Sequence, residues 1–206
     1  MGFKILKVKT GIGVEEDIER VVRLAERYKN KLTIRVDANQ GYSLADLNTF
    51  IRGTKSAGIE LIEQPLPVGE EEVLKGLDTS IRKILAGDES LKDPAAALQY
   101  AAGVQPFGIY NIKLMKCGGV LGALDIATIA YYGNIDLFWG CNDESIISIT
   151  AALHAAYTCV NTRYIDLDGS FDLAEDLVTG GFTLEDGYMK INQSPGFGFT
   201  KSALVS

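Results

Sequence analysis

Three acidic residues recur at a nearly constant interval in the first half of the chain. Asp37, Glu63 and Asp88 are 26 and 25 residues apart, and each lies at or just beyond the end of a short apolar run. One βα unit takes about 25–30 residues, so this interval predicts that each acid occupies the same place in successive units. Carboxylate oxygens are ligands that Mg²⁺ prefers in proteins. We therefore expect these three side chains to bind one Mg²⁺ ion.

Lysine residues accompany this acidic row. Lys7 and Lys9 share one face of the run at 3–9, because side chains alternate along a strand, and Lys113 lies in a later run at 108–114. A lysine acts as a base where neighbouring positive charge or burial lowers its pKa from about 10.4. A divalent cation between two lysines suits removal of a proton next to a carboxylate, with the metal stabilising the enolate. We expect Lys9 and Lys113 to be catalytic, and Lys7 to bind substrate and to supply positive charge next to Lys9.

A further acidic pair lies in the last apolar run. Asp166 and Asp168 share one face of residues 164–168 by alternation. Two carboxylates favour an ammonium group, because charge-assisted hydrogen bonds are worth about 1.5–3 kcal/mol. We expect them to bind the ammonium group of a substrate. The alternative is that these charged residues are ordinary polar residues of the surface or form structural ion pairs. That explanation would account for any one of them, but it accounts poorly for the whole set at matched strand ends.

Other kinds of chemistry find little support in the sequence. The only histidine, His154, lies in an apolar helical run and is expected to pack. The cysteines, Cys117, Cys141 and Cys159, form no CxxC pair and have no plausible histidine partner. This argues against a zinc cluster, a disulfide framework and nucleophilic hydrolysis, although Cys117 and Cys141 could border a pocket. The glycine-rich turn at 117–122 matches no nucleotide-binding pattern.

Composition limits the class of protein. The chain has 206 residues, of which 47% are apolar, so we expect a single domain over residues 1–206. The net charge of −7 argues against binding to nucleic acid. The sequence contains no apolar run of about 18 residues and no signal-peptide pattern, which predicts a cytoplasmic protein without a membrane partner. Its partner would be a small-molecule substrate, and assembly into a homo-oligomer is left open.

Strand and helix patterns alternate along most of the chain. Helical patterns separate seven short apolar runs, at 3–9, 33–37, 59–63, 83–88, 108–114, 137–140 and 164–168. Such alternation predicts an α/β fold with a parallel sheet. Polar residues at consecutive strand ends favour a TIM-type (β/α) barrel over an open doubly wound sheet, which would gather them at one switch point. After Gly169 we expect glycine-rich, irregular chain.

Several motifs together resemble the enolase superfamily, in its muconate-lactonising (cycloisomerase) subgroup, and within it the dipeptide epimerases. They are Lys7-Val8-Lys9, Asp-Ala-Asn-Gln-Gly from Asp37, Glu-Gln-Pro from Glu63, Gly-Asp-Glu-Ser around Asp88, and Asn-Ile-Lys ending at Lys113. The resemblance implies two lysine bases, three Mg²⁺ ligands and an ammonium clamp at Asp166 and Asp168. It implies a racemase or epimerase that acts on a dipeptide by two-base 1,1-proton transfer.

The resemblance covers the barrel domain of the family only. In the family an N-terminal α+β capping domain comes first, and the Lys-x-Lys motif lies on the second of eight barrel strands. We therefore expect a truncated barrel of about seven strands, without its first strand and capping domain and inactive on its own. A cycloisomerase, an o-succinylbenzoate synthase or an N-acylamino acid racemase of the same subgroup is the alternative enzyme, and an inactive truncated barrel is the non-catalytic one.

Overall fold

The structure of the chain, a computed structural model, describes residues 2–202. Its contacts divide the chain into two compact units. The N-terminal unit consists of Phe3–Ser90 and Ala102–Ile109, and the C-terminal unit of Leu91–Ala101 and Tyr110–Ser206 with Met1–Gly2. The single domain remains a prediction. Seven strands, β1 to β7, are hydrogen-bonded in chain order within one sheet, which confirms the predicted βα order.

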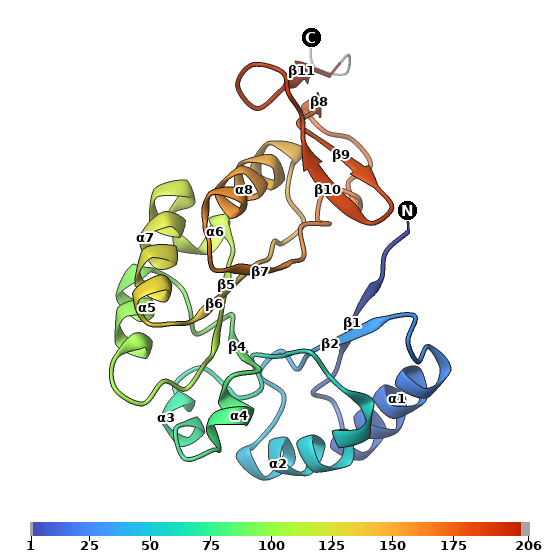
Figure 1. Ribbon diagram of the computed structural model, residues 1–206, viewed down its shortest axis with the longest axis vertical. Coiled ribbons are helices and arrows are strands. Elements are labelled where there is room, and N and C mark those ends of the chain that lie inside the picture. Colours follow the sequence, from blue (N-terminus) through green and yellow to red (C-terminus); the bar gives the residue numbers. More distant parts are fainter. Residues whose placement is uncertain (1, 203–206) are drawn as a thin grey trace. The chain divides into compact units, whose positions relative to one another are not determined.

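The N-terminal unit alternates strands and helices (Figure 1). Its strands are β1 (Ile5–Lys9), β2 (Thr33–Asp37), β3 (Ile62–Glu63) and β4 (Leu85–Gly87). Its helices are α1 (Val14–Arg27), α2 (Leu44–Gly53), the 3₁₀ helix η1 (Lys55–Ala57), α3 (Glu71–Leu74) and α4 (Thr79–Arg82). The four strands pair in parallel, so their carboxyl ends meet at one edge.

Local signals explain where these helices begin and end. The Ser43 side chain accepts a hydrogen bond from the Asp46 N–H, and the Asp46 carboxylate accepts one from the Ser43 N–H, which forms a capping box at the start of α2. The segment between β3 and β4 forms two short helices and not one continuous helix. Asp78 has extended backbone angles (φ −55°, ψ 144°) and separates the single turns α3 and α4.

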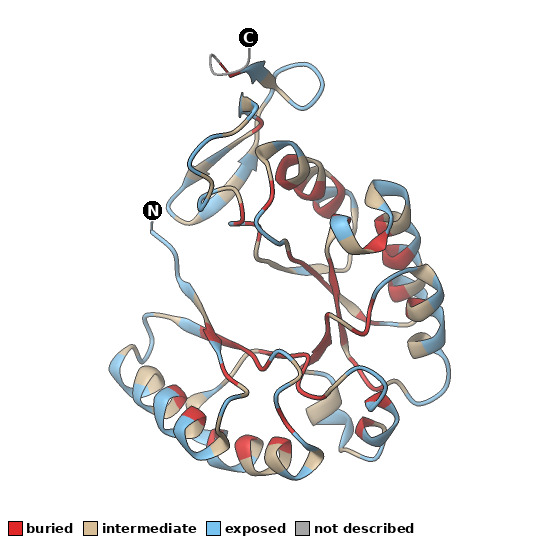
Figure 2. Ribbon diagram, turned by 180° about the vertical axis from the view of Figure 1, so that it is seen from behind, coloured by how far each residue is buried: buried red, intermediate tan, exposed pale blue. Residues whose placement is uncertain are grey.

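The C-terminal unit first continues the alternation of strands and helices and then forms antiparallel strand pairs. Its βα part contains α5 (Pro94–Ala101), all but the first residue of β5 (Ile109–Ile112), α6 (Leu114–Cys117), α7 (Gly119–Tyr132), β6 (Asp136–Trp139), α8 (Ile146–Thr158) and β7 (Thr162–Ile165). The strand β5 is buried along its whole length, and buried positions also line α7 and α8 (Figure 2). In the part of the chain that the structure describes, no helix combines the length and apolarity needed to cross a membrane.

The chain beyond Gly169 is more regular than its composition indicated. Four short strands, β8 (Val178–Gly180), β9 (Phe182–Glu185), β10 (Tyr188–Ile191) and β11 (Phe199–Lys201), form two antiparallel pairs. The turn between β9 and β10 is Asp186-Gly187, and both residues have positive φ (50° and 83°). An Asp-Gly pair suits a two-residue hairpin turn of this kind, so the prediction of irregular chain here is wrong.

A carboxylate from this C-terminal segment caps α8. Asp176 accepts hydrogen bonds from the Ser145 hydroxyl (2.7 Å) and from the Ile146 N–H (2.6 Å), and Ser145 is the N-cap of the helix. Burial tends to raise the pKa of Asp176. The hydrogen bonds from Ser145 and from nearby backbone N–H groups outweigh that effect, and the pKa is lowered. The segment is therefore attached to α8 by an ionised acid.

Replacing Asp176 by Asn is expected to lower the free energy of unfolding by about 0.5–1 kcal/mol at neutral pH. A carboxyl with a lowered pKa in the folded state stabilises it above the unfolded pKa of about 3.9 and loses this contribution as the pH falls through the folded value. The stability gap between wild type and variant should therefore narrow below about pH 4. Thermal melts followed by circular dichroism test this, with Glu175→Gln, a neighbouring exposed acid, as the control. A gap that stays constant with pH would contradict it.

Candidate functional site

Three buried carboxylates lie at adjacent strand ends of the N-terminal unit. Asp37 ends β2, Glu63 ends β3, and Asp88 directly follows β4. Their exposed fractions are 1%, 0% and 2%. Asp37 is paired in register with Glu63, and Glu63 with Ala86, two residues before Asp88. Strand alternation therefore directs the three acids to one face, as the sequence predicted for metal ligands.

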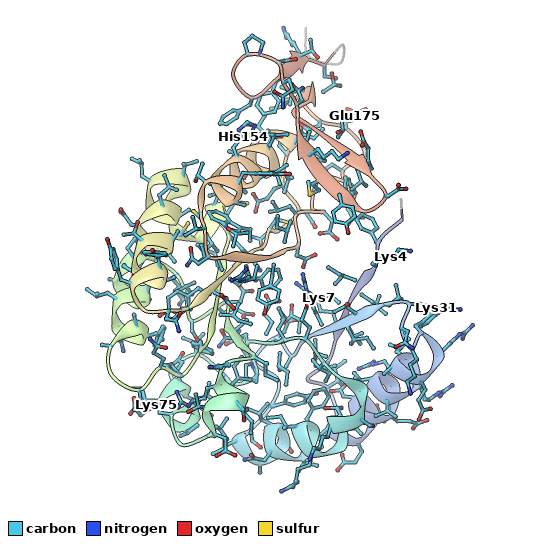
Figure 3. The ribbon with its side chains drawn as sticks, viewed as in Figure 1. Lys4, Lys7, Lys31, Lys75, His154 and Glu175 are labelled. Carbon is cyan, nitrogen blue, oxygen red and sulfur yellow. The ribbon has the colours of Figure 1, made fainter. Side chains whose placement is uncertain are left out.

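Two lysines of β1 contact this row of acids. Lys7 Nζ lies 3.2 Å from Glu63 Oε2 and 3.5 Å from Asp37 Oδ2. Lys9 Nζ lies 2.6 Å from Asp37 Oδ2 and donates a hydrogen bond to Asn39 Oδ1 at 3.0 Å. The Lys7 side chain, which is labelled in Figure 3, is 21% exposed, whereas that of Lys9 is 65% exposed. Lys9 is thus the lysine that a substrate can reach more easily.

The charges and donor atoms of this cluster are chemically suited to a divalent cation. Within residues 2–202, no three histidine, cysteine, aspartate or glutamate side chains already lie close enough together to hold a metal ion, so binding would require the side chains of Asp37, Glu63 and Asp88 to move toward one another. Buried carboxylates need positive charge nearby, and Lys7 and Lys9 supply part of it. A cation that prefers oxygen ligands would supply the rest, and Asp37, Glu63 and Asp88 offer those oxygens.

The ends of β1 and β2 are held together by tight backbone packing. The Thr10 N–H donates to the Asp37 carbonyl at 2.8 Å. Gly11 has a φ of 93°, and a Cβ at Gly41 would lie 2.1 Å from the Gly11 carbonyl oxygen, so both positions need glycine. The buried Asp17 accepts hydrogen bonds from the Gly11 N–H (2.7 Å) and the Tyr42 hydroxyl (2.8 Å).

Asp17 and Tyr42 were missed by the sequence analysis. Burial raises the pKa of Tyr42, so its hydroxyl stays protonated and donates to Asp17. Asp17 lies in α1 among other acids, Glu15 and Glu16, and nothing in its spacing distinguishes it from them. The two residues are 25 positions apart, and their contact forms only in the folded chain.

In the C-terminal unit, Lys113 directly follows the end of a strand and is not part of it. The strand β5 ends at Ile112, and Lys113 is the N-cap of α6 with extended backbone angles (φ −123°, ψ 125°). It therefore continues the direction of the strand, and its side chain is half-buried. Asn111, which shares its face by alternation, is fully buried against Gly140, where a Cβ would lie 2.4 Å from Asn111 Oδ1.

Asp166 and Asp168 follow β7, and Cys141 links them. The Cys141 thiol donates to the Asp166 carbonyl (3.3 Å) and lies 3.8 Å from Asp168 Oδ1, while its sulfur accepts from the Gly169 N–H (3.3 Å). Burial, with the nearby acids, raises the pKa of Cys141 to about 12, so the thiol is neutral. Asp168 is exposed and Asp166 half-buried, so neither residue is fully removed from solvent.

The structure thus brings the predicted residues into two groups. Lys7, Lys9, Asp37 and Glu63 are in direct contact in the N-terminal unit, with Asp88 on the next strand end. Asp166 and Asp168 share a cysteine contact in the C-terminal unit, which also contains Lys113. His154, on α8 (Figure 3), lies edge-on to Phe197 with ring centroids 5.0 Å apart, an arrangement of packed rings.

Comparisons with known proteins place this geometry in a family. The family model for the enolase C-terminal domain-like proteins matches residues 1–203. The L-Lys-D/L-Arg epimerase of Desulforapulum autotrophicum is 53% identical over 96% of this chain and 55% of its own length. The L-Lys-D/L-Arg epimerase of Methylococcus capsulatus is 52% identical over 96% of this chain and 56% of its own length.

Solved structures agree with these relatives. The crystal structure of a dipeptide epimerase from Methylococcus capsulatus, complexed with Mg and the dipeptide L-Arg-D-Lys, superposes with a TM-score of 0.94 at 52% identity. The match covers 96% of this chain and 56% of that one, so the chain spans about half the length of the relatives it matches. The predicted barrel fold of the enolase C-terminal kind is confirmed. The chain belongs to the enolase C-terminal domain-like family.

Proposed function

We propose that this chain is the catalytic barrel part of a Mg²⁺-dependent dipeptide epimerase. The observation that carries the proposal is the contact between Lys9 and Asp37, which places a solvent-accessible amine next to a buried carboxylate. Without a metal, this ion pair keeps Lys9 beside a negative charge. Mg²⁺ bound to Asp37 would bring positive charge next to the amine instead, and that is the setting in which a lysine can remove a proton beside a carboxylate. The names of the relatives that are more than 50% identical, both L-Lys-D/L-Arg epimerases, support the same reaction.

The residues of this chain would divide the reaction between them. Asp37, Glu63 and Asp88 would hold Mg²⁺, which when bound would stabilise the negative charge that develops on the substrate carboxylate. Lys9 would take the proton from the α-carbon, and Lys113 would return a proton to the opposite side of that carbon, so the configuration inverts. In the reverse direction the two lysines would exchange roles. Lys7, which contacts Asp37 and Glu63, would keep the acids in place beside the substrate.

The substrate class follows from the second acidic group. A dipeptide has a carboxylate at one end and an ammonium group at the other. Asp166 and Asp168 would bind the ammonium, with the neutral Cys141 thiol keeping the two acids in position without adding charge. The two similar L-Lys-D/L-Arg epimerases favour dipeptides of lysine and arginine as substrates.

The test is Asp168→Asn in a capped protein, which we define as this chain fused behind the capping domain of a relative. The KM for a dipeptide such as L-Lys-L-Arg should rise about 10–100-fold, because a charge-assisted hydrogen bond worth roughly 1.5–3 kcal/mol is lost. The KM for its N-acetylated form, which has no α-ammonium group, should change much less.

The control for this experiment is Asp172→Asn, an exposed acid four residues later. It should leave both KM values unchanged. If the unmodified protein prefers the acetylated substrate, the dipeptide proposal fails and an N-acylamino acid racemase becomes the better assignment. If it lactonises a diene diacid instead, the cycloisomerase alternative is correct.

A further inference from the structure

The side chain of Gln64 forms four hydrogen bonds inside the N-terminal unit. Gln64 is 1% exposed and directly follows Glu63. Its Oε1 accepts from the Asp88 N–H (2.9 Å) and the Ser90 N–H (3.2 Å). Its Nε2 donates to the Leu66 carbonyl (3.0 Å) and to Ser90 Oγ (2.7 Å). All donors and both lone pairs of the amide are used, so its orientation is fixed.

The network extends to a buried acid. Ser90 Oγ donates to Glu71 Oε1 at 2.5 Å, and the Glu71 carboxylate accepts from the Gly69 N–H at 3.0 and 3.1 Å. Ser90 and Glu71 are 4% and 8% exposed. The loop after β3 and the loop after β4 are therefore joined by buried side chains. Fully satisfied buried networks of this kind are rigid.

The backbone of Gln64 has an unusual conformation, which the same network holds in place. Its φ is 34°, in the left-handed region, and it precedes Pro65, which favours an extended conformation for the residue before it. Its N–H still donates to the Ala86 carbonyl at 2.8 Å, as a continuation of the pairing between β3 and β4. Strained backbone persists where surrounding contacts hold it, and the four side-chain hydrogen bonds supply that hold.

We propose that Gln64, with Ser90 and Glu71, forms a positioning unit that fixes the spacing of the two strand ends that carry Glu63 and Asp88 and so selects Mg²⁺ over larger cations. Gln64 is bonded covalently to Glu63 and holds the backbone of Asp88 through Oε1, so one side chain connects two neighbouring strand ends. Mg²⁺ requires a near-ideal octahedron with ligands at about 2.0–2.1 Å, whereas Ca²⁺ accepts flexible shells at about 2.3–2.6 Å. The inference rests on the proposed function, because it takes Glu63 and Asp88 as metal ligands.

The test compares Mg²⁺ and Ca²⁺ binding to this chain by calorimetric titration. Ser90→Ala removes the link between Gln64 and Glu71, and we expect it to weaken Mg²⁺ binding at least tenfold and Ca²⁺ binding less than threefold. Ser90→Thr keeps the hydroxyl and should restore Mg²⁺ affinity to within threefold of wild type. The control is Thr54→Val, which removes another buried hydroxyl of the same unit, bonded to the Phe50 carbonyl at 2.7 Å. It should leave both affinities unchanged.

The outcomes separate this inference from the function on which it rests. If the wild-type chain binds neither cation, the proposed metal site fails and the inference falls with it. If the wild type binds Mg²⁺ but Ser90→Ala binds it equally well, or loses Mg²⁺ and Ca²⁺ in equal measure, the inference alone is overturned. A second measurement covers the case in which Ser90→Ala does not fold. The Asp88 amide of the wild type should be protected from hydrogen exchange, and exchange at the rate of an exposed amide would refute the network.

Discussion

Alanine in place of either Lys9 or Lys113 is expected to reduce epimerisation in the capped protein by roughly 10²–10⁴-fold, the range for loss of a positioned acid or base. Each lysine would serve one side of the α-carbon, so inversion needs both. A single variant would retain one of the two proton transfers. It should therefore still exchange the α-proton of one enantiomer with solvent deuterium, and the two variants should act on opposite enantiomers.

The measurement is turnover by polarimetry, with deuterium incorporation followed by NMR. The control is Lys4→Ala, an exposed lysine just before β1 (Figure 3), which should leave turnover unchanged. Full turnover in the Lys9 or the Lys113 variant would remove that residue from the mechanism. Loss of exchange for both enantiomers in one variant would replace the two-base scheme by one in which the same lysine serves both sides.

Glu63→Gln should weaken Mg²⁺ binding to the chain by about 100-fold or more. Loss of a residue that only supports a metal ligand typically costs 10–100-fold in affinity, and loss of the ligand itself should cost at least as much. Glu63 is fully buried and lies on the central strand end of the acidic row. Glutamine has nearly the same shape as glutamate but carries no charge, so the substitution isolates the electrostatic contribution of Glu63 to Mg²⁺ binding. Calorimetric titration with Mg²⁺ measures the effect.

The choice of control for Glu63 depends on the structure. Alternation places Glu60 away from the face of Glu63, but its carboxylate lies 2.6 Å from Nε of the buried Arg35. Removing that charge would break an ion pair of the buried Arg35 and lower stability, so Glu60 makes a poor control. Glu72, whose side chain is 81% exposed, is better. Equal losses of Mg²⁺ affinity in Glu63→Gln and Glu72→Gln would disprove the ligand assignment.

The sequence was informative about residues that occupy equivalent positions in successive βα units. The spacing of Asp37, Glu63 and Asp88 located them at successive strand ends, because the length of a unit is nearly constant, and the observed register agrees. Alternation also placed Lys7 and Lys9 on the face of the acids. These predictions depend only on local periodicity, which a single sequence records directly.

Contacts between distant residues could not be predicted in the same way. The pairs Tyr42–Asp17, Gln64–Ser90 and Ser145–Asp176 are separated by 25, 26 and 31 residues. A polar residue in a loop has many possible partners, and only the folded backbone selects one. The hairpin at Asp186-Gly187 is a different case, because the Asp-Gly signal was present in the sequence but was obscured by the surrounding glycines.

The position of the only tryptophan allows the unfolding of one unit to be followed by fluorescence. Trp139, on β6, is fully buried, and its indole N–H donates to Thr162 Oγ1 at 3.0 Å, so its emission reports on the C-terminal unit alone. The N-terminal unit contains tyrosines such as Tyr28 and Tyr42 but no tryptophan. Selective excitation of the indole therefore follows one unit, whereas tyrosine emission includes the other. Coincident denaturation curves from the two signals would mean that both units unfold as one cooperative body, and separate curves would give each unit its own midpoint.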